Sequence, residues 1–77
     1  MADRLKVVLR SVRVKQIDFR DILESRYGLS LSLPTVNQYC NTVGARNTET
    51  WNTIRLCVKQ EFGIEYRNGR WEVNKDG

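Results

Sequence analysis

Apolar residues recur every three or four positions in four segments of the chain, the spacing that gathers them on one side of an α-helix. In the last of these segments Trp51 and Ile54 share one side, and in the third Val36, Cys40 and Val43 do the same. The pattern predicts four amphipathic helices, which cover residues 3–13, 18–27, 34–43 and 48–62.

The ends of the predicted helices carry residues that favour those positions. Asp18 and Thr48 can cap the second and fourth helices, because their side-chain oxygens can accept hydrogen bonds from free backbone N–H groups. Pro34 suits the first position of the third helix, where its missing N–H would have no partner in any case. Glycines follow three of the helices, where a chain often turns left-handed, at positions 28, 44 and 63.

Two further segments alternate apolar and polar residues, which is the period of a β-strand. Residues 29–33 alternate leucine with serine and predict a short strand with its leucines facing inward. Residues 64–73 predict a β-hairpin, because Asn68 and Gly69 can take the two positive-φ positions of a type I′ turn. The resulting register pairs Arg67 with Arg70, Tyr66 with Trp71 and Ile64 with Val73.

The length and composition describe one small α+β domain that is mostly helical. The chain has 77 residues, of which 40% are hydrophobic and 29% charged, and no run approaches the roughly 20 apolar residues that span a bilayer. We therefore expect a soluble cytoplasmic or nuclear protein that forms a single domain over residues 1–77. The hydrophilic residues 74–77 indicate either a frayed terminus or the start of a linker to a further domain.

The charge distribution favours a polyanionic partner. The net charge is +4, and Asp3 is the one acidic residue that precedes Asp18. Two arginines face each other at the hairpin tip, and they invite an anion such as phosphate unless Glu65 and Glu72 relieve them. The basic residues that lean toward the N-terminal helix are Arg4, Lys6, Arg10, Arg13 and Lys15.

The segment 39–54 places the small residue Cys40 four positions before Gly44, and Trp51 and Ile54 follow as apolar anchors. This segment and the order of elements around it resemble the winged helix-turn-helix superfamily over residues 18–73. In that family a small residue four positions before the turn glycine lets the two helices cross closely. The anchors fall one residue later than the family pattern places them, which indicates a turn longer by one residue.

The resemblance implies a winged helix-turn-helix with an extra N-terminal helix and the hairpin as its wing. It also implies sequence-specific binding of double-stranded DNA, in transcription regulation or replication initiation. The helix 48–62 would then read bases in the major groove, while the turn and the wing hold phosphates or enter the minor groove. The residues so implied are Arg46, Asn47, Thr48, Glu49, Asn52, Thr53, Arg55, Leu56, Lys59, Gln60, Arg67, Asn68 and Arg70.

A second register of the motif remains open at this point. It would make 18–27 and 34–43 the two motif helices, and the recognition helix would begin within residues 32–36. A homodimer is also expected, because one recognition helix covers only a few base pairs. Val7, Val14 or Leu56 could supply an apolar contact between the copies.

Catalysis and metal binding find little support in the sequence. The chain has no histidine and two cysteines, fewer ligands than a structural zinc site requires, so Cys40 and Cys57 are interpreted as buried thiols. No nucleophile stands beside a base, so we expect no enzyme activity, cofactor or small-molecule ligand. Two alternatives to DNA binding remain: a winged helix that serves as a protein-interaction or assembly module, and RNA binding.

Overall fold

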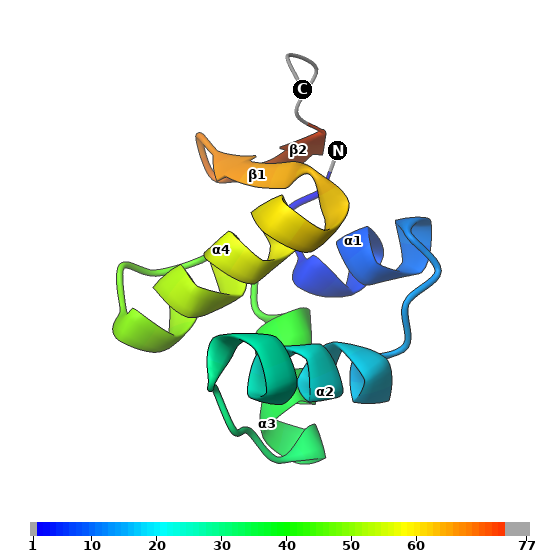
Figure 1. Cartoon of the computed structure of the whole chain (residues 1–77). Coiled ribbons are helices and arrows are strands. Elements are labelled where there is room, and N and C mark those ends of the chain that lie inside the picture. Colours follow the sequence, from blue (N-terminus) through cyan, green and yellow to red (C-terminus); the bar gives the residue numbers. More distant parts are fainter. Residues whose placement is uncertain (1, 74–77) are drawn as a thin grey trace.

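The computed structural model of the chain describes residues 2–73, which form four helices followed by a β-hairpin (Figure 1). This arrangement confirms the mostly helical α+β class. The hydrophilic segment 74–77, predicted to be a frayed end or a linker, lies outside the described residues. The elements are α1 (Leu5–Ser11), α2 (Gln16–Tyr27), α3 (Leu33–Asn41), α4 (Glu49–Phe62), β1 (Ile64–Arg67) and β2 (Arg70–Val73).

The ends of α4 follow the prediction, whereas the start of α2 does not. The Thr48 hydroxyl accepts a hydrogen bond from the Trp51 N–H at 3.2 Å, and Gly63 ends the helix at φ 68°. The expectation that Asp18 caps α2 is wrong, because this helix already begins at Gln16. Asp18 lies instead in the first turn, where a negative charge is favoured by the helix dipole.

The segment 29–33 forms no strand, contrary to the prediction. Its backbone is irregular, and the Ser32 hydroxyl caps α3 by accepting a hydrogen bond from the Thr35 N–H at 3.4 Å. The helix therefore begins at Leu33, so Pro34 takes its second position rather than the first. Of the three leucines expected to face inward, two are partly buried against the core and Leu33 is 38% exposed.

The end of α3 also differs from the prediction. The helix stops at Asn41, and Val43, expected in its buried stripe, is 60% exposed. The reason is that residues 43 and 44 extend alongside the N-terminal segment instead of completing another helical turn. The Gly44 N–H donates to the Asp3 carbonyl at 2.8 Å, and Val43 is bridged to Arg4.

The hairpin has the predicted register and turn. Arg67 faces Arg70, Tyr66 faces Trp71, and the turn residues Asn68 and Gly69 have φ values of 52° and 77°. These positive angles are those that a type I′ turn requires at both central positions. The pattern of apolar and polar residues was therefore sufficient to place every pair of this hairpin.

An extended N-terminal segment, residues 2–4, lies beside β2 (Figure 1). The Trp71 N–H donates to the Ala2 carbonyl at 2.7 Å, and the Ala2 N–H donates back to the Trp71 carbonyl at 3.1 Å. Residues 2–4 therefore lie between the hairpin and residues 43–44. The extended neighbour of the hairpin comes from the N-terminus, and not from residues 29–33.

One hydrophobic core joins the helices to the hairpin. The two cysteines are buried in it, as expected, and burial raises the pKa of Cys40 to about 11 and of Cys57 to about 12. Both thiols therefore stay protonated and unreactive at neutral pH. None of the helices in residues 2–73 has the length and apolar character needed to cross a bilayer. The largest fully buried side chains are Trp71, Phe19, Leu5, Leu23, Ile54 and Ile64.

Candidate nucleic-acid interface

The part of α4 that does not face the core has two sides with different surroundings. The inner stripe is buried as predicted, with Trp51, Ile54 and Val58 in the core. On one side of the outer surface, Lys59 and its neighbours along the helix face β1. On the other side, Gln60 faces the end of α2. The residues that the sequence assigned to a single surface are therefore divided between two environments.

An open groove of about 320 Å³ runs between α4 and β1. It brings together four of the predicted contact residues on consecutive turns of α4, from Asn52 to Lys59. Leu56 lies among them and is 46% exposed. The lining is completed by two hairpin residues that sequence reasoning did not assign to the site; the full set is Asn52, Arg55, Leu56, Lys59, Glu65 and Tyr66.

The hairpin positions Arg55 through an aromatic ring. The Arg55 guanidinium carbon lies 5.4 Å from the centre of the Tyr66 ring, within the range of a cation–π contact. Tyr66 packs edge-on against the fully buried Trp71, with 5.1 Å between ring centres. Tyr66 is half-buried, with one part packed inside and another lining the groove.

Glu65 holds basic residues from both sides of the groove. Its carboxylate lies 3.4 Å from Lys59 Nζ and 2.9 Å from Arg67 Nη2, and its side chain is 17% exposed. The hydrogen bond from Arg67 lowers the pKa of Glu65 below its usual value, and the charge of Lys59 acts in the same direction. Glu65 is therefore ionised at neutral pH, and it relieves the repulsion expected at the hairpin tip.

Arg70 has different neighbours from Arg67. The ion pairs within residues 2–73 do not include Arg70, whose side chain lines a separate hollow with Asp3 and Val7. The two arginines face each other in the register of the hairpin but lie in different surroundings. Asn68, in the turn between them, is exposed.

The loop before α4 presents exposed polar groups next to the start of the helix. Arg46 and Asn47 are exposed, and the Asn52 side-chain amide donates to Asn47 Oδ1 at 3.3 Å. The Thr48 hydroxyl is occupied as the cap of α4. These residues are therefore close to the N-terminal end of the groove.

Two further predicted contact residues, Thr53 and Glu49, lie in the first two turns of α4. The Thr53 hydroxyl donates to the Glu49 carbonyl at 3.1 Å, so its oxygen can accept further hydrogen bonds but its hydrogen is already used. The Glu49 side chain is exposed in the first turn of the helix, where its charge is favourable to the helix dipole.

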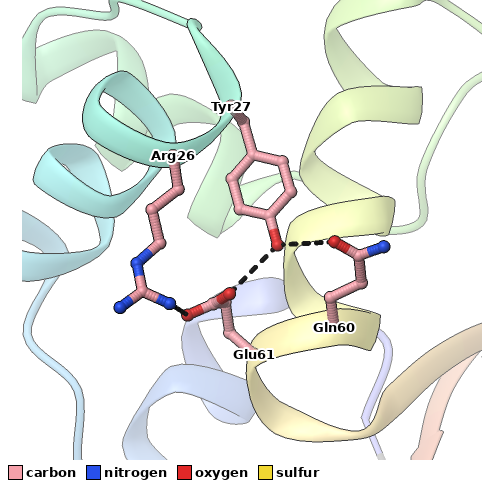
Figure 2. Close-up of polar contacts among 4 residues, drawn as sticks. All are labelled: Arg26, Tyr27, Gln60 and Glu61. Carbon is pink, nitrogen blue, oxygen red and sulfur yellow. Dashed lines mark hydrogen bonds and ion pairs between the residues drawn. The ribbon is translucent and has the colours of Figure 1, made fainter.

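Gln60 is held away from the groove by the end of α2 (Figure 2). The Tyr27 hydroxyl lies 3.0 Å from Gln60 Oε1 and 3.1 Å from Glu61 Oε2. Arg26 Nη1 donates to Glu61 Oε1 at 2.9 Å, so the two helices are joined by a polar cluster. Burial raises the pKa of Tyr27, and the hydrogen bond to Glu61 adds to the shift. Glu61 is therefore a link between α2 and α4.

The alternative recognition helix, α3, has an uncharged outer surface. Asn37, Gln38 and Asn41 are exposed there, and the amide of Asn41 donates to the Asn37 carbonyl at 2.9 Å. At its start, the hydroxyls of Ser32 and Thr35 are 2.8 Å apart and bond to each other. The hairpin packs along α4, so cations from two elements converge beside that helix.

No group of three or more His, Cys, Asp or Glu residues within residues 2–73 is arranged to hold a metal ion. Comparison of the chain with protein families, curated proteins and solved structures finds no match in any of the three.

Proposed function

We propose that this protein is a winged helix-turn-helix module that binds double-stranded DNA with sequence specificity. In this proposal α3 and α4 are the motif helices, α4 is the recognition helix and the hairpin is the wing. The observation that carries the proposal is the groove between α4 and β1. Arg55 and Lys59 line it together with Asn52 and Leu56, and Arg67 is paired with Glu65 of the groove lining.

The groove residues have the chemistry that duplex recognition requires. An α-helix fits the major groove of B-DNA, where Asn52 can bond to both edge atoms of adenine and Leu56 can contact a thymine methyl group. A good bidentate pair discriminates against the wrong base by about 1–3 kcal/mol. Arg55 and Lys59 provide positive charge for phosphates or guanine, and Tyr66 limits the directions that Arg55 can take.

The two ends of this surface would hold the DNA backbone. Arg46 and Asn47 precede α4, and Arg67, Asn68 and Arg70 form the hairpin tip. Contacts of this kind set the position of a protein on a duplex without reading its sequence. The proposal leaves Gln60 outside the interface, because its side chain is bound to Tyr27.

A DNA-associated role in transcription regulation or replication initiation follows from this proposal, and no catalytic step is assigned to the chain. We also propose a two-fold homodimer on an inverted repeat, because one helix reads only a few base pairs. Val7 is exposed and could meet a second copy, whereas Leu56 lies in the groove assigned to DNA and Val14 packs partly against the core.

The first experiment is selection of bound sequences from a random duplex pool at near-physiological salt. We expect an enriched motif, and fluorescence anisotropy should show tighter binding of that motif than of a scrambled duplex. If no motif is enriched and the residual binding disappears steeply as salt rises, the positive charge is a nonspecific attraction and the proposal fails.

The wing is tested by reversing the charge of Arg67 and Arg70 together. The double variant R67E/R70E should bind the selected duplex at least about tenfold more weakly, because two phosphate contacts become repulsive. The control is K15E/R20E, which changes the net charge equally on one exposed and one partly exposed residue around the start of α2. Equal binding by the two double variants would contradict the role of the wing.

The runner-up function is a protein-interaction module, which the exposed Leu56 in the groove favours. The same variants separate the two functions. A module that binds only protein would retain its partner in R67E/R70E and would show no preference between duplexes in the selection. Preference for structured RNA over a duplex of equal length would point to the third function class.

A further inference from the structure

Three basic residues lie on or directly after α1. Lys6 and Arg10 are four residues apart and share one side of the helix, and Arg13 follows two residues after the helix ends at Ser11. Lys6 is partly exposed and the other two are exposed. We call these three residues the basic stripe. None of them lines the groove between α4 and β1, so the stripe is a separate feature of the surface.

Within residues 2–73, no ion pair involves the basic stripe. The ion pairs of residues 2–73 use Arg20, Arg26, Lys59 and Arg67, and none comes from α1. No acidic residue occupies the first turn of this helix. Like charges three or four residues apart on a helix repel each other, which weakens the helix. Lys6 and Arg10 therefore repel each other, while the helix dipole favours Arg10 in the last turn.

The backbone of Arg13 is a second source of local destabilisation. It has φ 59°, in the left-handed region where glycine is usual and other residues are strained. Its position is set by the end of α1, where the Val14 N–H donates to the Leu9 carbonyl and the Arg13 N–H to the Arg10 carbonyl. Arg13 is therefore kept in an unfavourable backbone conformation with its side chain exposed, which indicates a role outside the fold.

The buried side of α1 argues against a lipid surface as the partner of the basic stripe. Leu5, Val8 and Leu9 are packed in the core with at most 2% exposure, so α1 has no apolar side to insert into a lipid surface. The side chains of α1 that remain outside include the cations Lys6 and Arg10 and a single apolar residue, Val7. Lys6 and Arg10 are about 6 Å apart along the helix axis, comparable to two phosphate steps of about 3.4 Å per strand along duplex DNA.

We propose that the basic stripe of α1 is a second contact surface for the phosphate backbone of duplex DNA, which adds affinity without sequence preference. This inference rests on the proposed function. The stripe carries no amide and no exposed large apolar residue that could read a base edge. Its contribution is therefore electrostatic, and it depends on salt through the release of counterions from the DNA.

The test is the salt dependence of binding by the variant K6Q/R10Q, measured by anisotropy on the selected duplex and on a scrambled one. The slope of log affinity against log salt should become shallower by about 0.9 for each residue that contacts a phosphate. The ratio of the two affinities should stay as in the wild type. Glutamine is about as good a helix former as lysine and arginine, so an unchanged melting temperature is expected to show that α1 persists.

The matched control is K15Q/R20Q, which removes the same net charge from exposed or partly exposed residues near the start of α2 and should leave the slope nearly unchanged. Equal slopes for the wild type and K6Q/R10Q overturn the inference while the proposed function stands. An equal loss in both double variants also overturns it, because net charge then explains the effect. If the wild type binds no duplex even at low salt, the proposed function fails, and this inference fails with it.

Discussion

Arg13 stands where the end of α1 favours glycine. Its φ of 59° lets the chain close two hydrogen bonds at the helix end, one of them from the Val14 N–H to the Leu9 carbonyl at 3.0 Å. A side chain in this conformation costs about 1–2 kcal/mol, which glycine avoids because it has no Cβ. The sequence does not predict this left-handed conformation, because an arginine gives no indication of it.

We expect Arg13→Gly to raise the free energy of unfolding by about 0.5–1 kcal/mol. The relief of backbone strain exceeds the greater entropy that glycine gives to the unfolded chain. Denaturant unfolding measures the change, and Arg13→Ala is the control, because it removes the same charge and keeps the strain. An equal gain in both variants would mean that charge, and not φ, sets the effect. If the basic stripe contacts DNA, Arg13→Gly should also reduce the salt dependence of binding.

The sequence explains only part of why glycine occupies position 44. The sequence places a glycine after the third helix, and its φ of 81° agrees with the need for a residue without a side chain. A Cβ at this position would also lie 3.0 Å from the Tyr66 hydroxyl, which belongs to β1. The contact brings the loop before α4 against the hairpin, and only the folded chain reveals it.

At the scale of elements, the Glu65 carboxylate links α4 to β1 through an ion pair. Glu65 is bound to Lys59 on the helix and to Arg67 on its own strand, with its shorter contact of 2.9 Å to Arg67. A phosphate that approaches Arg67 must compete with this carboxylate. Glu65 therefore lowers the affinity for any anion at the wing while it orients the two cations.

We expect Glu65→Gln to bind duplex DNA severalfold more tightly, with an unchanged preference between selected and scrambled duplexes. The reason is that Arg67 no longer gives up a charged partner when it meets a phosphate. The matched control is Glu72→Gln. Glu72 is exposed and faces Glu65 across the hairpin, so the net charge changes equally without touching the ion pairs described here. DNA titrations of both variants at the same salt measure the change in affinity. Equal gains in affinity for the two variants would contradict this account.

At the scale of the whole molecule, residues 2–4 connect two parts that lie far apart in the sequence. The Trp71 N–H of β2 donates to the Ala2 carbonyl, and the Gly44 N–H before α4 donates to the Asp3 carbonyl. The hairpin and the loop are thus positioned by a common segment. In the proposed function, this segment sets how the wing and the start of α4 are placed on the same duplex.

We expect deletion of the residues before Leu5 to remove the hydrogen-bond acceptors of two backbone N–H groups that are distant in sequence. Hydrogen exchange at Trp71 and Gly44 should speed up together, because both lose a backbone acceptor. The Asn52 N–H, which donates to the Thr48 carbonyl at 2.8 Å within α4, serves as the control and should stay protected. Unchanged exchange at Trp71 and Gly44 would show that the segment does not hold these parts together.

Local features were predictable from the sequence because they depend on residues a few positions apart. The four helices follow from the spacing of apolar residues, and the hairpin register follows from alternation around Asn68 and Gly69. The cap of α4 at Thr48 is local in the same sense. Side-chain chemistry within one or two turns is enough to specify such elements.

Contacts between distant segments arise only when the elements pack, so sequence patterns carry no direct sign of them. The residues 29–33 have the alternation of a strand, yet Ala2 takes the place beside β2 because the N-terminal segment lies next to Trp71 in the fold. In the same way Gln60 has the spacing of an outer helix residue, and Tyr27 from α2 binds it. Periodicity tells which side of an element is polar, whereas packing determines which neighbour that side meets.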